Sequence, residues 1–295
     1  MSTAQAAKRI IVFGGNGFLG SRICKAAVAR NWDVTSVSRS GAPHWSSVSS
    51  SPSPPNWSTS VHWERADIFQ PSQWLALLKS ADCVVHSLGI LLEADYKKVI
   101  SGRESPFTFL SRSASSASRP SANPLDRKPG DDTPIDGNNS AKQQTYELMN
   151  RDSAILLAKE SASAGVKAFG YISAAAGAPI LPGRYISTKR EAEDVIEREF
   201  GKEMRGVYFR PPFMYDSSRA LTMPLAAGAM AASTVNGVMG GVLGRILGAA
   251  AIKPLKADLV ADAVVEGLAD EKVRGAVEVE RLEELGARGW RREMV

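Results

Sequence analysis

A glycine-rich turn between an apolar run and a helix constrains the fold of this chain more than any other feature. The run Ile10-Ile11-Val12-Phe13 predicts a buried strand, and residues 21–30 predict the helix that follows it. Between them, the glycines at 14, 17 and 20 suit a dinucleotide loop, because they permit a tight turn, close approach to a pyrophosphate, and close packing of helix on strand. Glycines that only shape a turn are the alternative, but the flanking strand and helix lie at the correct distance for nucleotide binding. The predicted binding residues here are Gly14, Asn16, Gly17, Phe18, Leu19 and Gly20.

Segments with the periodicity of strands and of helices alternate along the rest of the chain. Further strands are predicted at 34–38, 61–66, 83–87, 168–173 and 207–210, and helices at 71–80, 145–164, 185–200 and 258–270. Such alternation is typical of a parallel sheet with helices on both faces. With 295 residues, 44% of them hydrophobic, the chain is long enough for one large domain. We therefore expect an α/β fold: a single NAD(P)-binding domain over residues 1–295, with a Rossmann-type doubly wound parallel sheet and a small C-terminal substrate lobe.

Two insertions and a C-terminal lobe are expected within this domain. Residues 41–60 and 101–141 are rich in Ser, Pro and other polar residues, which predicts flexible insertions. Residues 211–255 are expected to form a lobe that faces substrate or membrane. Residues 220–244 within it carry no charge, but Gly and Ala dilute their hydropathy, so we expect an apolar groove or a bilayer-docking surface rather than a membrane span; a loose Gly/Ala loop is the alternative. Arg288, Arg291 and Arg292 predict a solvated basic tail.

The end of the second predicted strand carries the signal for cofactor choice. Folds that prefer NAD place a carboxylate here to accept a hydrogen bond from the ribose 2′-hydroxyl. This chain instead has Ser38, Arg39 and Ser40, and no Asp or Glu lies between Asp33 and Glu64. An arginine flanked by two hydroxyls suits a 2′-phosphate through charge-assisted hydrogen bonds. The sequence thus favours NADPH/NADP+ over NAD(H), with a solvated surface arginine as the alternative.

Two other predicted strand ends extend the nucleotide site. Ligands of open α/β sheets bind outside the carboxyl ends of the strands. Asp67 and Ile68 follow the third strand and are placed to meet the adenine. Leu88 and Gly89 follow the fourth strand, where they carry the backbone past the cofactor.

A tyrosine and a lysine four residues apart form the predicted catalytic pair. Tyr185 and Lys189 share one face of a predicted helix, so the lysine charge favours the phenolate and lowers the pKa of the phenol. Lys189 would also hold the nicotinamide ribose. Ser173, twelve residues before the tyrosine and at the end of the fifth strand, would orient a substrate carbonyl. Asn150 would hold the backbone, or a water that relays protons to Lys189.

Composition argues against several other classes of function. The net charge of +5 is mild, and no block of Lys or Arg stands out, so we expect no nucleic-acid partner. An anionic cofactor or an anionic membrane surface would account for the charge. The three histidines lack ligand spacing, so we expect no metal site. Cys24 and Cys83 lie in apolar settings and are predicted to be free core thiols.

The glycine loop, Ser173, Tyr185, Lys189 and Arg210-Pro211 together resemble an extended or atypical short-chain dehydrogenase/reductase. A closer resemblance is to the fungal mitochondrial NAD(P)-binding protein of the coenzyme Q biosynthetic complex, a group similar to the dinucleotide-binding accessory subunit of respiratory complex I. The segments that carry this closer resemblance are 12–20, 36–41, 84–93 and 189–193. The resemblance implies that Pro211 belongs to the cofactor site.

The same resemblance implies a peripheral protein on the matrix side of the mitochondrial inner membrane. Its partners would be proteins of the coenzyme Q biosynthetic complex and a polyprenylated quinone intermediate or lipid. The expected function is an NADP(H)-binding reductase in ubiquinone biosynthesis, acting on a carbonyl or quinone intermediate. A nucleotide-loaded assembly or regulatory subunit without turnover is the first alternative. A sugar-nucleotide epimerase or dehydratase is the second.

Overall fold

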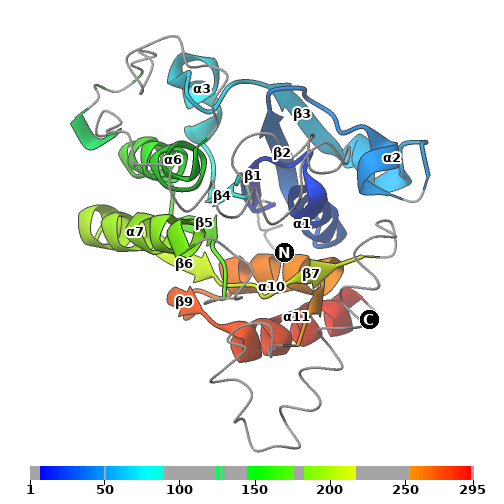
Figure 1. Ribbon diagram of the computed structural model, residues 1–295. Coiled ribbons are helices and arrows are strands. Elements are labelled where there is room, and N and C mark those ends of the chain that lie inside the picture. The colour runs from blue at the N-terminus through cyan, green and yellow to red at the C-terminus, as the bar shows by residue number, and fades with distance from the viewer. Residues whose placement is uncertain are drawn as a thin grey trace, which may run out of the picture.

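The computed structural model describes residues 7–49, 51–89, 124–126, 128, 130, 145–175, 183–216 and 253–293. Its centre is a seven-stranded sheet in the order β3-β2-β1-β4-β5-β6-β9, in which every neighbouring pair is parallel (Figure 1). The chain starts at β1, builds outward to β3, then crosses back to β4 and builds the other half. The predicted α/β class, a doubly wound parallel sheet of Rossmann type, is confirmed.

The strands and helices follow the predicted alternation. The sheet strands are β1 (Arg9–Phe13), β2 (Asp33–Ser38), β3 (Val61–Arg65), β4 (Cys83–His86), β5 (Ala168–Ile172), β6 (Arg205–Phe209) and β9 (Gly275–Val277). A separate parallel pair is formed by β7 (Met214–Tyr215) and β8 (Leu255–Lys256). The α-helices are α1 (Phe18–Ala29), α2 (Trp45–Val48), α3 (Leu75–Leu78), α6 (Ser153–Ser163), α7 (Gly183–Phe200), α10 (Ala257–Ala269) and α11 (Val279–Glu293). Shorter turns are η1 (Asn56–Ser60), η2 (Pro71–Gln73), η3 (Pro124–Asp126) and the π-helical η4 (Glu147–Asp152).

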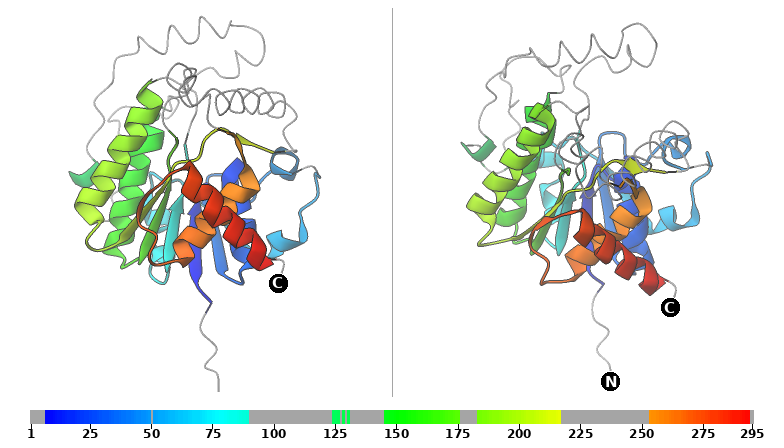
Figure 2. Two further views of the ribbon diagram at one scale, coloured as in Figure 1. Left: turned by 90° about the horizontal axis from the view of Figure 1, so that it is seen from below. Right: turned by 60° about the horizontal axis from the view of Figure 1, so that its bottom comes forward.

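Two apolar cores lie on opposite faces of the sheet. In β1, Ile10 and Val12 join the core under α1, α10 and α11, whereas Ile11 and Phe13 join the core under α3, α6 and α7. The alternation follows from the two-residue period of a strand, and a strand buried on both faces must be apolar throughout. The views in Figure 2 show α6 beside α7 on one face and α11 lying across α10 on the other.

Several elements differ from their prediction. The helix predicted over 71–80 is divided into η2 and α3 at Trp74, which leaves helical geometry and packs edge-to-face against Phe13 in the core, with ring centroids 5.1 Å apart. The predicted basic tail is helix α11, where Leu282 and Leu285 are fully buried. Its arginines are paired, Arg288 with Asp270 and Arg292 with Glu266. Insertion 101–141 lies almost wholly outside the described residues, and region 220–250 lies entirely outside them.

The segment 41–60 contains α2 and η1 and is anchored by three tryptophans. Trp45 lies 5.7 Å from both Trp57 and Trp63, centroid to centroid, in edge-to-face contacts. Trp63 donates its indole N–H to the carbonyl of Ser58 at 3.0 Å. Edge-to-face aromatic pairs contribute about 0.5–1.5 kcal/mol each beyond their buried area. The two loop tryptophans therefore fasten this insertion to β3. Within the described parts of the chain, none of the helices has both the length and the hydropathy to span a bilayer.

Arg205 at the start of β6 fastens the sheet to the end of α10. Its guanidinium donates to the carbonyls of Gly267, Leu268, Asp270 and Val273, which surround the C-terminus of that helix. Arg205→Met removes the donors and leaves these carbonyls without them. We expect a loss of about 2–3 kcal/mol in the free energy of unfolding, measured by urea denaturation. Arg198→Met, which removes an exposed pair with Glu199, is the matched control and should cost under about 0.5 kcal/mol. Equal effects of the two substitutions would contradict this assignment.

Candidate functional site

The glycine loop between β1 and α1 has the backbone geometry that a dinucleotide needs. Gly14 has a φ of +84°, a conformation that side chains with a Cβ rarely adopt, and its N–H donates to the carbonyl of Val37 at 2.9 Å. A Cβ on Gly20 would lie 2.1 Å from the carbonyl oxygen of Gly14, so any side chain there would push α1 away from the loop. The glycines predicted at these positions are thus required by the turn and by the close approach.

The first turn of α1 suits an anion. Its N-cap is Gly17, which has no side chain to satisfy the free N–H groups, and the first turn contains no acidic residue. Free N–H groups and the positive end of the helix dipole together favour a phosphate. The chain thus fits the pyrophosphate of a dinucleotide at this helix end. Phe18 is half-buried with the Arg22 guanidinium 4.5 Å from its ring centroid, and Leu19 is buried in the core.

Two arginines, not one, lie at the end of the β2–β3 pair. Arg39 is exposed, and its carbonyl accepts a hydrogen bond from Nε of Arg65. Arg65 is the last residue of β3 and pairs in register with Ser38 of β2. The Ser38 hydroxyl is buried and donates to the carbonyl of Gly41 at 2.7 Å, so it shapes the turn instead of facing a phosphate. Ser40 accepts from Nδ2 of Asn16 at 2.6 Å, which links this edge to the glycine loop. Arg65 escaped sequence reasoning because only the sheet register brings it beside Arg39.

The other predicted nucleotide residues take different positions. Asp67 caps its own turn, with Oδ1 accepting from the N–H of Phe69 at 3.0 Å, and Ile68 is buried in the core. Pro211 is buried, and its carbonyl accepts from the N–H of Ala175 at 2.9 Å across the ends of β5 and β6. Asp67 thus shapes the turn after β3, whereas Ile68 packs in the core and Pro211 connects the ends of β5 and β6.

Leu88 and Gly89 connect the glycine loop to the predicted catalytic pair. The Cδ2 of Leu88 lies 2.9 Å from where a Cβ on Gly14 would be, and a Cβ on Gly89 would lie 3.1 Å from Oδ1 of Asn150 and 3.5 Å from Nζ of Lys189. One short stretch after β4 therefore contacts both halves of the site. The structure brings Asn150 and Lys189 together, as the sequence predicted.

Tyr185 and Lys189 lie on the same face of α7, turned toward β5. The ammonium of Lys189 is 5.5 Å from the ring centroid of Tyr185 and donates to the carbonyl of Ile172 at 2.8 Å. Ser173, the next residue, is buried at the end of β5. The tyrosine ring also packs edge-on against Tyr146, with centroids 5.8 Å apart. The predicted triad of Tyr185, Lys189 and Ser173 is thus assembled around the exit of β5.

Burial controls the protonation of this pair. It raises the pKa of Tyr185 to about 12, with the neighbouring Tyr146 adding to the effect, and it lowers the pKa of Lys189 to about 7. The expectation that the lysine lowers the pKa of the phenol is wrong for this structure, because desolvation of the phenolate dominates. Tyr185 is accordingly a protonated phenol at neutral pH, able to donate a proton.

The hydroxyl of Ser173 is held by a residue that sequence reasoning missed. Nη1 of Arg190 donates to Oγ of Ser173 at 2.8 Å, and Nη2 donates to the carbonyl of Ala174 at 2.7 Å. Arg190 also pairs with the buried Glu193, which pairs in turn with Arg210. The Ser173 oxygen accepts a hydrogen bond from the guanidinium, so its O–H can be donated to another group. In the sequence, the only indication of this contact was that Arg190 directly follows Lys189.

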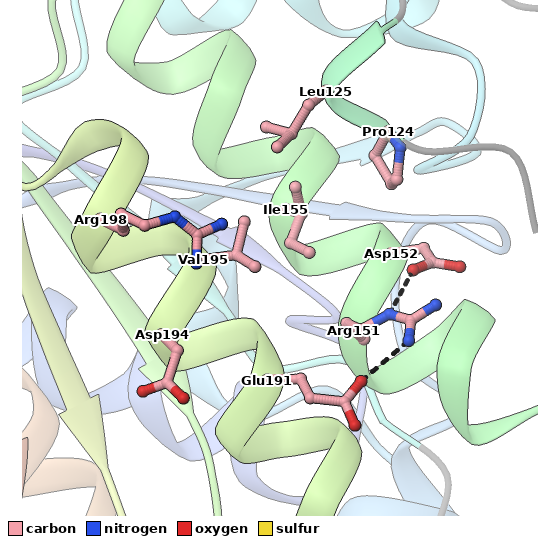
Figure 3. A pocket seen from close by; sticks show the side chains of 9 residues that line it. All are labelled: Pro124, Leu125, Arg151, Asp152, Ile155, Glu191, Asp194, Val195 and Arg198. Carbon is pink, nitrogen blue, oxygen red and sulfur yellow. Dashed lines mark hydrogen bonds and ion pairs between the residues drawn. The ribbon is translucent and has the colours of Figure 1, made fainter.

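A cavity in the described part of the chain lies on the other face of α7. Its volume is about 480 Å³, and Figure 3 shows Arg151 there between Asp152 and Glu191. The α7 residues that line it, Glu191, Asp194, Val195 and Arg198, recur every three or four positions on the side away from Lys189. This cavity is therefore separate from the nucleotide site. Among the described residues, no group of His, Cys, Asp and Glu side chains is arranged to hold a metal ion.

The buried ammonium of Lys189 predicts a pH-dependent stability. Its pKa of about 7 lies below the value of 10.5 for an exposed lysine, so the unfolded chain binds more protons between these values and its stability contribution improves as pH rises from 6 to 9.5. Lys189→Met removes the cost of burying the charge, which at pH 6, below both pKa values, is roughly 5 kcal/mol. We expect its stability relative to wild type to fall steadily toward pH 9.5 in urea titrations. Lys167→Met, at an exposed lysine, should show no such trend.

Comparison with known proteins finds one matching family model and relatives in yeast and in a plant. Residues 10–96 match the NAD dependent epimerase/dehydratase family. MIOREX complex component 2 of Saccharomyces cerevisiae is 42% identical over 225 residues, which are 72% of this chain and 74% of that protein. An uncharacterised chloroplastic protein of Arabidopsis thaliana is 38% identical over 95 residues, 32% of this chain and 29% of that protein.

Solved structures share the fold at low identity. UDP-glucuronic acid 4-epimerase from Bacillus cereus in complex with NAD superposes with a TM-score of 0.53 at 14% identity, over 92% of this chain and 76% of that chain. MoeE5 in complex with UDP-glucuronic acid and NAD gives a TM-score of 0.50 at 15% identity, over 91% and 74%. These two matches support the Rossmann-type fold alone. The identity to the yeast protein across most of both sequences shows more: the chain belongs to the family of MIOREX complex component 2.

Proposed function

We propose that this protein binds NADP(H) and reduces a carbonyl of a polyprenylated quinone intermediate in coenzyme Q biosynthesis. It would act within the biosynthetic complex, peripherally bound on the matrix side of the mitochondrial inner membrane. The observation that carries the chemistry is the assembly of Tyr185, Lys189 and Ser173 at the exit of β5, connected to the glycine loop through Leu88 and Gly89. The complex and its location rest on the sequence resemblance, in agreement with a relative whose name makes it a complex component.

Each residue has a role that follows from its position. A nicotinamide bound here would supply hydride to the carbonyl carbon. Tyr185, protonated at neutral pH, donates a proton to the carbonyl oxygen as negative charge develops there. Ser173 donates its O–H to the same oxygen, because Arg190 occupies its acceptor side. Lys189 holds the ribose hydroxyls, with its Nζ 5.5 Å from the ring centroid of Tyr185.

The 2′-phosphate preference is supported by two arginines, Arg39 and Arg65, whose contact runs from Nε of Arg65 to the backbone carbonyl of Arg39. They lie at the end of the β2–β3 pair, where no acidic residue follows β2 to accept from a ribose hydroxyl. Charge-assisted hydrogen bonds to a phosphate are about twice as strong as neutral ones.

A second candidate is a nucleotide-loaded assembly subunit without turnover. The pKa of Tyr185 favours the assembly role, because a phenol with a pKa near 12 is a weaker acid than a catalytic group whose pKa lies near neutrality. The name of the yeast relative, a complex component, agrees with such a role. The sugar-nucleotide epimerase alternative rests on fold similarity at 14–15% identity, which does not carry a substrate.

The cofactor preference is tested at the two arginines. Arg39→Ala and Arg65→Ala should each weaken NADPH binding by roughly 5- to 20-fold in calorimetry, since each removes a charge-assisted hydrogen bond. NADH affinity should stay within about twofold. Arg198→Ala, on the far side of α7, is the control. Tighter binding of NADH than NADPH by the wild type would overturn the preference.

Catalysis is tested by Tyr185→Phe, which removes only the proton donor. We expect NADPH affinity within about twofold of wild type, but at least a 100-fold lower rate of quinone-intermediate reduction. In a coenzyme Q-deficient strain that lacks the homologous protein, this variant should fail to restore respiratory growth. Tyr208→Phe, at another buried tyrosine, should restore it. Full complementation by Tyr185→Phe would favour the assembly role.

A further inference from the structure

The helix before β5 begins with a π-helical turn. In η4 the N–H of Ser153 bonds to the carbonyl of Leu148, five residues back, instead of four. Such turns are rare and are frequently found at functional sites, because the wider turn redirects side chains and leaves carbonyls to be satisfied by other groups. Asn150 lies in the middle of this turn and is fully buried.

Two side chains of the central sheet hold the turn, Tyr171 by a bond to one of its carbonyls and His86 by a bond to the hydroxyl of Ser153. The hydroxyl of Tyr171 on β5 donates to the carbonyl of Asn150. The hydroxyl of Ser153 donates to the carbonyl of Met149 at 2.8 Å, so it must accept in its 2.8 Å contact with Nε2 of His86 on β4. His86 and Tyr171 are register neighbours, their ring centroids lie 5.5 Å apart, and both side chains are fully buried.

The imidazole of His86 has one defined protonation state. Its proton lies on Nε2, because Ser153 can only accept there, and Nδ1 has no hydrogen-bond partner among the described residues. Burial, with Lys189 adding to the effect, lowers the pKa of His86 to about 3, so the ring is neutral at physiological pH. At position 86 the turn thus requires a neutral side chain that can donate a hydrogen bond to the hydroxyl of Ser153.

The turn so held sets the position of Asn150 against the nucleotide site. Oδ1 of Asn150 and Nζ of Lys189 converge on Gly89, and the same ammonium lies 5.1 Å from the ring centroid of Tyr171. Tyr171 therefore contacts the turn with its hydroxyl and Lys189 with its ring face. A shift of the turn would move Asn150 relative to both Gly89 and Lys189.

We propose that His86 and Tyr171 are positioning residues for nucleotide binding, which act through the π-helical turn to hold Asn150 beside Gly89 and Lys189. This inference rests on the proposed nucleotide-binding function. Neither residue would touch the nucleotide. A merely structural role would instead lower the stability of the fold and leave the affinity of the folded protein unchanged.

Matched substitutions in the full-length protein separate these two roles. Tyr171→Phe removes one hydroxyl, and His86→Leu removes the donor to Ser153. Each should weaken NADPH binding about tenfold in calorimetry at pH 7.5, the effect of one lost hydrogen bond. His86→Gln offers an amide donor near the place of Nε2 and should recover affinity to within about threefold. The controls Tyr208→Phe, whose hydroxyl bonds Glu197, and His62→Leu, at an exposed histidine, should leave affinity unchanged.

The pathway through Asn150 is tested by a double substitution. If Tyr171 acts through Asn150, the Tyr171→Phe/Asn150→Ala protein should bind NADPH no more weakly than Asn150→Ala alone, because the two effects are not independent. Amide hydrogen exchange in residues 147–153 of the nucleotide-free protein should rise about tenfold in Tyr171→Phe, and not in Tyr208→Phe. If His86→Leu fails to fold, the comparison of Tyr171→Phe with Tyr208→Phe decides.

The outcomes that overturn the inference differ from those that overturn the proposed function. A wild-type protein without measurable affinity for NADPH rejects the proposed function, and the positioning role with it. A wild-type protein that binds NADPH, with Tyr171→Phe and Tyr208→Phe equally tight or equally weak, rejects the positioning role alone. Fully additive losses in the double variant reject the route through Asn150.

Discussion

The close approach of α1 to the loop after β1 is the constraint on which the rest of the site depends. A Cβ on Gly20 would lie 2.1 Å from the carbonyl oxygen of Gly14, so the helix reaches its position only because no side chain intervenes. That contact points the uncapped first turn of α1 at the carboxyl edge of the sheet. It also holds the loop against Leu88, which follows β4. Gly89, the next residue, lies beside Lys189. The short segment after β4 therefore contacts both the glycine loop and the catalytic pair.

Helix α7 serves two environments, and its sequence divides accordingly. Tyr185, Lys189 and Glu193 face the sheet, whereas Glu191 and Arg198 face the cavity on the outer side. Burying Lys189 carries a desolvation cost, which its hydrogen bond to Ile172 and the charge of Glu193 offset in part. The same burial keeps Tyr185 protonated. Desolvation thus raises the pKa of the phenol, whereas we expected from sequence that the lysine would lower it.

What the sequence predicted well are features that depend on local pattern. The apolar run of β1 and the glycine spacing predicted the fold class. The Tyr-x-x-x-Lys pattern predicted that Tyr185 and Lys189 share a helix face, and in the structure Ser173 and Asn150 lie near this pair. Features that depend on register or on a single long-range contact were not predictable. Arg65 meets Arg39 only through the pairing of β3 with β2. Ser38 has the residue type of a phosphate ligand, but its hydroxyl is used by the backbone of Gly41. The amphipathic pattern of α11 was obscured by its arginines, which pair with acids on and after α10.

The π-helical turn shows why a polar side chain in a strand can be more than a satisfied core residue. His86 lies in β4, where both faces are buried and an apolar residue would pack without the cost of burying an imidazole. Part of that cost is offset by one hydrogen bond to Ser153, while Nδ1 gains no partner among the described residues. An apolar residue at position 86 would therefore serve the stability of the strand at least as well as this histidine. A strand that must hold the next helix in a widened turn, with Asn150 aimed at Gly89, gains a defined attachment point, and the polar burial is then explained by the geometry of the site.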